Sequence, residues 1–275
     1  MTAVSTALVT GATSGLGRGL AKELSGRGWT VLVHGRDERR CAAVVEELRA
    51  TGGQAQAYVA DLAELRQVAE LANRVAADHP GLGLLINNAG VGSGGHRDGR
   101  QVSADGYELR LAVNYLAPVL LTRLLHGQLR AAAPSQVLNI GSVGQSEIDF
   151  ADPQFTRRYD GMEAYTRSKF ALAAFTFATA AQYEPDGITV NCSHPANYMD
   201  TAMVREAGVS PWTTVAAGCR AALYALDQGA GETGVFYNER HAGRAHRRAY
   251  DAGLQRQLLA LTDELIGTAR GVDIS

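Results

Sequence analysis

The sequence predicts an α/β fold in which helices cover both faces of a doubly wound parallel β-sheet. Short apolar segments alternate with longer segments whose apolar residues recur at helical spacing, and the short segments are rich in Val, Leu and Ile. A glycine-rich turn joins the first short segment to the first long one. At 275 residues, 46% of them hydrophobic, the chain can bury one large core, so we expect a single domain over 1–275.

About seven strands are expected, and the order strand, helix, strand implies right-handed crossovers between parallel strands. In chain order their sequences are VSTALVT, TVLVH, AQAYVA, LGLLINNAG, QVLNIGS, ITVNCSH and VFYN. Two irregular loops, 91–106 and 146–161, follow strands directly. Open parallel sheets bind ligands at the carboxyl ends of their strands, so we expect the functional site beside these loops.

Composition and charge narrow the classes of partner. A formal charge of -2 gives no long-range attraction for nucleic acid or anionic lipid. Cys41, Cys192 and Cys219 are widely spaced and form no CxxC pair, which predicts reduced thiols and no metal site. No apolar run reaches about 18 residues, and the first strand begins too close to Met1 for a signal peptide or anchor. We therefore expect a cytoplasmic protein that binds small molecules and no membrane.

The segment TALVTGATSGLGRGLAKELSGRG predicts a strand, a tight turn and a helix. Gly11, Gly15 and Gly17 let the turn bend and let backbone N–H groups approach a pyrophosphate at the positive end of the helix. The GxxxGxG spacing differs from the GxGxxG dinucleotide fingerprint, so a glycine turn without a ligand remains an alternative.

The residues after the second strand bear on the choice between NAD and NADP. Gly35 stands where NAD enzymes often place a carboxylate for the ribose, and Arg36 supplies a cation for a 2'-phosphate. Asp37 and Glu38 are expected to begin the next helix. NADP(H) is therefore favoured over NAD(H), with a solvated surface charge as the alternative for Arg36.

Two further strand ends carry polar residues. Asp61 and Glu64 form a capping-box pattern, so a helix cap and an adenine contact are both open for Asp61. The fourth strand closes on the NNAG turn at 87–90, which is expected either to lie against a cofactor or to support the sheet.

Tyr165 and Lys169 are the strongest catalytic candidates. They stand four residues apart in YTRSK, so they share one helix face, and a nearby ammonium favours the phenolate of a tyrosine that otherwise titrates near pH ~10. Ser142 ends the fifth strand, where its hydroxyl can donate to a substrate carbonyl oxygen. The alternatives are a turn serine and an exposed Tyr–Lys pair.

Asn114 lies in an apolar helix four residues before Pro118. Proline has no N–H, so the carbonyl of Asn114 loses its helical partner, the helix must kink, and the freed carbonyl can hold water. A kink that serves packing alone is the alternative. The later helix FALAAFTFATAAQYEP is apolar nearly all round, which predicts cover from the core or from another subunit.

In this order and at these intervals, the motifs resemble the short-chain dehydrogenase/reductase family over essentially the whole chain. The matching features are TGATSGLG, Asp61, NNAG, Asn114, Ser142, Tyr165, Lys169 and the HPA segment from His194. The resemblance implies a Rossmann-like fold, a nicotinamide cofactor, carbonyl or alcohol substrates, and homodimers or homotetramers. It also implies that Tyr165 is the general acid or base, Ser142 orients the carbonyl, Lys169 binds the nicotinamide ribose and lowers the pKa of Tyr165, and Asn114 carries a relay water. The expected cofactor contacts are Gly11, Thr13, Ser14, Gly15, Leu16, Gly17, Arg36, Asp61, Leu62, Asn88, Ala89, Gly90, Tyr165, Lys169, Pro195 and Thr201.

Within the family, NYLAPVLLT, EIDF and the long interval from Ser142 to Tyr165 look most like the retinol dehydrogenase and protochlorophyllide reductase branch. One departure follows the sixth strand. The family usually has Pro-Gly there and a Thr five residues after the proline, whereas Pro195 is followed here by Ala196, and Thr201 comes six residues later. Asn197 is expected to take the left-handed conformation that the missing glycine would provide.

The substrate side is less defined by the sequence. The resemblance implies that segment 195–215 forms a lid over the substrate. Its large apolar side chains would either line the pocket or belong to the ordinary core, and they are Tyr198, Met199, Met203 and Trp212. Charged and aromatic residues of the two loops either line a substrate mouth or, as we favour, stay in solvent. These residues are His96, Arg97, Arg100, Phe155, Arg157, Arg158 and Tyr159. The basic run at 239–248 is likewise expected to be solvated.

Together these features favour an NADP(H)-dependent oxidoreductase that interconverts a ketone or aldehyde with an alcohol, with Tyr165 as general acid or base. A C=C reductase or a non-redox biosynthetic enzyme on the same fold stays open. So does a non-catalytic nucleotide-sensing protein, although the joint presence of the Ser, Tyr and Lys argues against it.

Overall fold

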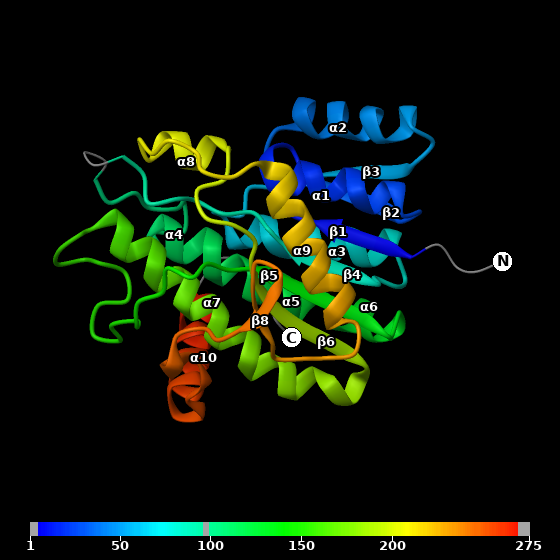
Figure 1. Cartoon of the computed structure of the whole chain (residues 1–275). Helices are drawn as coiled ribbons and strands as arrows, with labels where there is room; N and C mark the ends of the chain where they lie inside the picture. The colour runs from blue at the N-terminus through cyan, green and yellow to red at the C-terminus, as the bar shows by residue number, and fades with distance from the viewer. Residues whose placement is uncertain (1–4, 96–98, 269–275) are drawn as a thin grey trace.

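The computed structural model describes residues 5–95 and 99–268, and its sheet has eight strands in the order β3-β2-β1-β4-β5-β6-β7-β8 (Figure 1). Strands β1 to β7 are parallel, and β8 is antiparallel to β7. The strands are β1 (Thr6–Val9), β2 (Thr30–Gly35), β3 (Gln54–Val59), β4 (Leu84–Asn87), β5 (Ser135–Ile140), β6 (Ile188–His194), β7 (Phe236–Asn238) and β8 (His241–Gly243). The predicted fold class is confirmed.

The short strand β8 is not indicated by the sequence pattern. It lies within the basic run 239–248, and its three residues are exposed, so no apolar alternation marks it. Glu239 has a φ of 54° and, with Arg240, forms the two-residue connection between the paired residues Asn238 and His241. Part of the run expected to be solvated therefore extends the sheet as an exposed edge strand.

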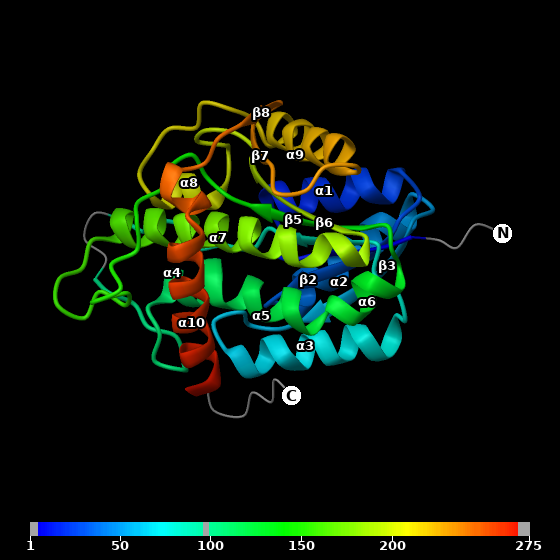
Figure 2. The same cartoon turned by 90° about the horizontal axis from the view of Figure 1, so that it is seen from below.

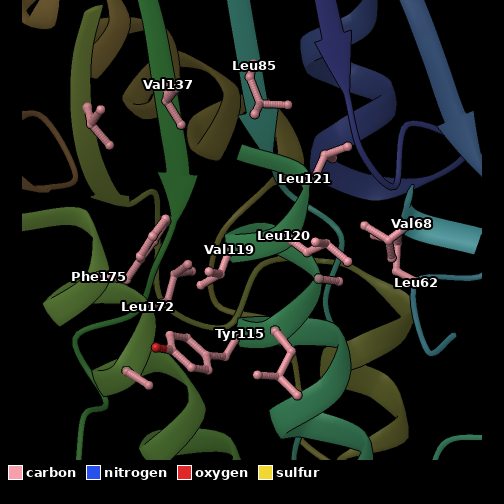
Figure 3. Close-up of a cluster of buried hydrophobic side chains, with 14 of the residues drawn as sticks. Leu62, Val68, Leu85, Tyr115, Val119, Leu120, Leu121, Val137, Leu172 and Phe175 are labelled. Atoms are coloured by element: carbon pink, nitrogen blue, oxygen red, sulfur yellow. The ribbon is translucent and has the colours of Figure 1, made fainter. Parts of the chain in front are cut away.

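Helices cover both faces of the sheet (Figure 2). One face carries α1 (Gly15–Gly26), α2 (Glu38–Ala50) and α9 (Val215–Gly229), and the other carries α3 (Leu65–Asp78), α5 (Ala117–Leu124) and α7 (Gly161–Tyr183). Figure 3 shows the second interface, where Leu85 and Val137 of the sheet face Leu120 and Phe175 of the helices. The remaining helical segments are α4 (Leu109–Leu111), η1 (Ala112–Leu116), α6 (His126–Ala131), η2 (Glu184–Asp186), α8 (Ala202–Glu206), η3 (Arg247–Tyr250) and α10 (Ala252–Thr268).

The strand order reverses between β1 and β4. The chain adds β2 and β3 on one side of β1 and then crosses back to add β4 and the following strands on the other side. The turns that leave β1 and β4 therefore part to opposite faces of the sheet, and open α/β sheets bind ligands in the crevice outside the carboxyl edge at such a reversal. The glycine turn and the NNAG turn are these two connections.

The apolar helix α7 is covered by the chain itself. Phe177 on α7 stacks on Tyr250 of η3 with ring centroids 4.2 Å apart, and α10 packs across α7 (Figure 2). The hydroxyls of Tyr115 on η1 and Thr262 on α10 lie 2.6 Å apart. The sequence predicted that this helix is buried either by the core of the same chain or by another subunit. In the described residues it is covered by segments of the same chain.

Candidate active site

The glycine turn is held by a buried histidine. The Nδ1 atom of His34 accepts from the Gly11 N–H at 3.2 Å, and its Nε2 lies 3.2 Å from the carbonyl oxygen of Ala60. A ring nitrogen that accepts an N–H carries no proton, so Nε2 is the protonated nitrogen and donates to Ala60. Burial lowers the pKa of His34 to about 4. Its role in the site was not predicted from the sequence, because its neighbours in the strand are apolar.

The N-terminus of α1 is chemically open. Its N-cap Ser14 makes no side-chain cap bond, its first turn carries no acidic residue, and within the described chain no group accepts from the amides of Gly15, Leu16 and Gly17. By contrast, side chains of Asp37, Asp160 and Thr214 cap α2, α7 and α9. Free amides at a positive helix end fit an anion such as a dinucleotide pyrophosphate.

The close packing of the turn explains two glycines. A Cβ on Gly17 would lie 2.3 Å from the Gly11 carbonyl oxygen, and one on Gly35 would lie 2.5 Å from Cγ2 of Thr13. No side chain fits at position 35 without a shift, so the position where a ribose-binding acid often stands is closed to one here. Arg36 is exposed and has no ion-pair partner among the described residues, while Asp37 caps α2 as expected.

Asp61 is not the cap of α3, so the capping-box interpretation is wrong. The helix begins at Leu65, and the N–H of Leu65 donates to the Asp105 carboxylate at 2.8 Å. Asp61 instead accepts from the Ala63 N–H at 2.9 Å in a local turn, because it stands too far before the first helical turn. Leu62 beside it is buried. The side chain of Asp61 thus remains near the crevice without serving the helix.

The NNAG turn is tied to β1. The Thr10 hydroxyl accepts from the backbone N–H groups of Asn88 and Ala89 at 2.9 and 3.0 Å, and Nδ2 of Asn88 donates to the Thr10 carbonyl at 2.7 Å. These bonds show that Asn88 supports the sheet. Gly90 follows, and a Cβ there would lie 3.2 Å from Oδ1 of Asn114 and 3.8 Å from Nζ of Lys169. The turn therefore brings bare backbone close to two of the predicted catalytic residues.

Tyr165 and Lys169 lie together, but the predicted pKa effect is not found. The buried Nζ of Lys169 donates to the carbonyl of Ile140 at 2.8 Å and lies 5.8 Å from the centroid of the Tyr165 ring. Burial raises the pKa of Tyr165, and a hydrogen bond with Ser142 lowers it by a smaller amount. Burial also lowers the pKa of Lys169 to about 8. Desolvation therefore dominates the pKa of the phenol, and the Lys169 ammonium donates to a carbonyl instead of to the phenol.

Ser142 and Asn114 complete the cluster. The Ser142 hydroxyl oxygen accepts from the Gly144 N–H at 3.0 Å, which leaves its own proton free to donate. Asn114 lies in the π-helical turn η1, where the Ala117 N–H donates to Ala112, so the chain accommodates Pro118 by a wider turn. The Asn114 side chain bonds Val91 N–H at 2.7 Å and the Val91 carbonyl at 2.9 Å. The loss of the helical hydrogen bond from residue 118 to the Asn114 carbonyl was predicted from the sequence, but these two side-chain hydrogen bonds to Val91 were not.

Segment 195–215, which is expected to form a lid, runs from the glycine turn to Gly90. A Cβ on Gly15 would lie 3.1 Å from Cγ2 of Thr201, and the Met203 thioether methyl would lie 3.8 Å from a Cβ on Gly90. Pro195, which begins the lid, is buried. The predicted left-handed residue is wrong by one position. Tyr198, with a φ of 42°, takes this conformation instead of Asn197 and rests against Trp212 with ring centroids 4.5 Å apart.

The two irregular loops pack on each other. Nε of Arg100 donates to the Gln154 carbonyl at 2.8 Å, and a Cβ on Gly161 would lie 2.2 Å from the Ser93 carbonyl oxygen. Phe155 is buried and Tyr159 is half-buried. Arg157 and Arg158 are exposed. Arg157 forms ion pairs with Asp149 and Asp152. His96 and Arg97 lie outside the described residues. The two arginines are thus exposed, Arg100 is half-buried against Gln154, and Phe155 contributes to packing.

Two further properties concern residues 5–95 and 99–268, the described part of the chain. Within these ranges no group of three or more His, Cys, Asp or Glu residues is arranged to hold a metal ion. The helices described there include none with the length and apolar character that a bilayer crossing requires. Cys41, Cys192 and Cys219 are buried free thiols.

Comparison with known proteins agrees with this geometry. The family model described as short chain dehydrogenase matches residues 5–210. The chain belongs to the short-chain dehydrogenase/reductase family.

Curated members of this family place the chain in the retinol dehydrogenase branch, as predicted. It is 36% identical over 195 residues to human retinol dehydrogenase 13, an alignment that covers 69% of this chain and 58% of that protein. It is 38% identical over 212 residues to mouse polyprenol dehydrogenase, covering 74% and 62% of the two chains. The chain thus spans less than two thirds of the length of these relatives.

Solved structures of the family share the fold. The Pseudomonas aeruginosa RhlG/NADP active-site complex matches with a TM-score of 0.71 and 26% identity over 85% of this chain and 94% of that chain. A short chain dehydrogenase from Burkholderia cenocepacia in complex with NADP matches with a TM-score of 0.68 and 27% identity, over 85% and 95% of the two chains. Both of these relatives are complexes with NADP, and both share the sheet-and-helix scaffold described above.

Proposed function

We propose that this protein is an NADP(H)-dependent oxidoreductase that interconverts a ketone or aldehyde with the corresponding alcohol. The observation that carries the proposal is the convergence of Tyr165, Ser142 and Lys169 beside an open, glycine-lined helix N-terminus. Family membership supports a nicotinamide cofactor, and relatives solved with NADP support the choice of nucleotide. The cofactor, when bound, supplies or accepts the hydride.

The crevice residues fit such a cofactor. The amides of Gly15, Leu16 and Gly17 suit the pyrophosphate, and the exposed guanidinium of Arg36 suits a 2'-phosphate. The other contacts we assign are Thr13 and Ser14 beside the pyrophosphate, Asp61 and Leu62 beside the adenine, Asn88, Ala89 and Gly90 along the nicotinamide half, and Pro195 with Thr201 from the lid.

The catalytic side chains divide the proton chemistry. Because its pKa is raised, the Tyr165 phenol is protonated at neutral pH and donates its proton to the carbonyl oxygen during reduction. Ser142, whose Oγ already accepts from Gly144, donates its hydroxyl hydrogen to the same oxygen. The Lys169 ammonium, with a pKa of about 8, is mostly charged at pH 7 and restores the proton of Tyr165 together with water near Asn114.

Apolar alcohols are the first substrates to test. Val143 follows Ser142 and is 47% exposed, and Met162 precedes Tyr165 by one helical turn and is 54% exposed. Apolar side chains that are exposed to solvent beside the catalytic residues are suited to bind an apolar substrate. The retinol and polyprenol dehydrogenases among the relatives support the same class.

The function is tested by coupling cofactor oxidation to product. Purified protein with NADPH and a panel of apolar aldehydes and ketones should form one alcohol per NADPH oxidised, and the reverse reaction should proceed with alcohols and NADP. Matched enones distinguish the two reductions, because carbonyl reduction gives an unsaturated alcohol and C=C reduction gives a saturated ketone. Saturated ketone as the product would contradict the proposal in favour of a C=C reductase, and NADPH binding with no turnover on any compound would favour a nucleotide-sensing protein.

The assignment of Arg36 predicts a selective loss of NADPH affinity. Arg36→Ala should weaken NADPH binding about 10-fold to 100-fold, the size of one or two charge-assisted hydrogen bonds, and change NADH binding less than about 2-fold. Fluorescence titration of both nucleotides measures the two affinities, with Arg39→Ala, an exposed arginine one turn later, as the matched control. Equal weakening of NADH and NADPH by Arg36→Ala would remove the 2'-phosphate role.

A further inference from the structure

Gln145 links the end of β5 to the C-terminal part of the chain. Its Nε2 donates to the Ser142 carbonyl at 2.6 Å, and its Oε1 accepts from the backbone N–H of His246 at 2.9 Å. The His246 ring packs edge-on against Phe170, with ring centroids 5.4 Å apart. Phe170 is the neighbour of Lys169 on α7, so this chain of contacts connects the two elements that carry Ser142 and Lys169.

The amide of Gln145 is matched to its two partners in one orientation. A backbone carbonyl only accepts and a backbone N–H only donates, so a flipped amide would oppose oxygen to the Ser142 carbonyl and NH₂ to the His246 N–H. An ionised glutamate can accept from His246 but cannot donate to Ser142. The bond to Ser142 therefore requires a hydrogen-bond donor at this position, while the bond to His246 requires only an acceptor oxygen.

The position of Ser142 depends on contacts with nearby residues, because Ser142 lies beyond the end of β5 and is not held by strand hydrogen bonds. β5 ends at Ile140, and the Ser142 hydroxyl is directed by the Gly144 N–H two residues later. Holding the Ser142 carbonyl fixes the peptide plane from which this turn starts, and thereby the direction of the hydroxyl. His246 lies beyond residue 210, where the match to the family model ends, so this support comes from outside the matched region.

We propose that Gln145 is a positioning residue that holds Ser142 in its donating geometry by tying it to His246 and, through Phe170, to the catalytic helix. This inference rests on the proposed function, because it gives Ser142 a role in carbonyl reduction. Gln145 acts only through Ser142, and a displacement of a reacting group by a fraction of an ångström is enough to slow a reaction severalfold or more.

The test uses Gln145→Glu and Gln145→Ala, with Glu147→Gln as the matched control. Glu147 pairs with Arg248 at 3.4 Å, so the control removes the negative charge from another contact between the same two segments. At pH 7 both Gln145 variants should lose about 10-fold in kcat and bind NADPH unchanged, and the control should keep wild-type kcat. As the pH falls, Gln145→Glu should regain activity relative to Gln145→Ala, because the protonated acid again donates to the Ser142 carbonyl.

Amide hydrogen exchange in the cofactor-free protein gives an independent readout. The Gly144 amide, which donates to Ser142 Oγ, should exchange faster in both Gln145 variants but not in Glu147→Gln. The His246 amide should lose protection only in Gln145→Ala, since glutamate keeps the acceptor. Wild-type kcat in both variants, or parallel pH profiles of Gln145→Glu and Gln145→Ala, would overturn the inference. If the wild-type protein reduces no carbonyl, the proposed function fails, and exchange at Gly144 alone then decides whether Gln145 positions Ser142.

Discussion

Tyr165→Phe should reduce kcat for carbonyl reduction about 1000-fold and leave NADPH affinity within about 2-fold, because a positioned general acid contributes roughly 10²- to 10⁴-fold. The variant removes only the phenolic oxygen. Lys169, held by the Ile140 carbonyl at 2.8 Å, keeps its place, so we expect the contact that we propose between it and the cofactor to remain. Steady-state kinetics with the best carbonyl substrate and a fluorescence titration of NADPH measure the two effects.

Tyr183→Phe is the control for this loss. Tyr183 lies at the other end of α7, buried beside His126 with ring centroids 4.4 Å apart, and it should keep wild-type turnover. In the wild-type protein, reduction should also slow at high pH as Tyr165 loses its proton, because burial raises rather than lowers its pKa. A Tyr165→Phe protein that retains its kcat would mean that the proton comes from another group.

His34 should make the fold sensitive to moderate acid. The unfolded side chain titrates near pH ~6.5, whereas burial lowers the pKa to about 4 in the folded protein. Between these values the unfolded state binds the extra proton, so the contribution of His34 to stability is complete above pH ~6.5 and is lost as the pH falls toward 4. The full difference amounts to about 3 kcal/mol, since each pKa unit corresponds to ~1.4 kcal/mol.

Urea unfolding of the wild type and of His34→Asn between pH 4 and 7.5 gives the unfolding free energy of each protein. The change with pH in the difference between these two free energies measures the contribution of His34. Asn can still accept an N–H but does not titrate, so the difference in unfolding free energy should shrink as the pH falls. His126→Asn, at a half-buried position that pairs with Asp186 outside the crevice, should not reproduce the change. If the plots of unfolding free energy against pH for the wild type and His34→Asn stay parallel, the pKa of His34 is not lowered in the folded protein.

The fold could be predicted because its strands are buried on both faces. Val31, Leu32 and Val33 of β2, for example, are all fully buried, and an apolar run of this kind between helical patterns is typical of a central parallel strand. The glycine turn and the Tyr165–Lys169 pair were likewise visible, because local spacing alone fixes their geometry.

Contacts between distant parts of the chain could not be predicted. The carboxylate that caps α3 comes from Asp105, 40 residues after Leu65, and no local pattern distinguishes it from Asp61. Gln145 and His246 are separated by 101 residues, and one of the two bonding groups is a backbone N–H that almost any residue would provide. The pKa of Tyr165 depends on burial, which spacing along one helix does not reveal.

The cover that α10 provides for α7 also orders events during synthesis. Residues 252–268 are the last described part of the chain to leave the ribosome, yet they shield a helix that is completed about seventy residues earlier. Until they emerge, the outer side of the helix that bears Tyr165 lacks this cover, so we expect chaperones that bind exposed apolar segments to act there. Final packing of α7 therefore follows the synthesis of the sheet on which that helix packs.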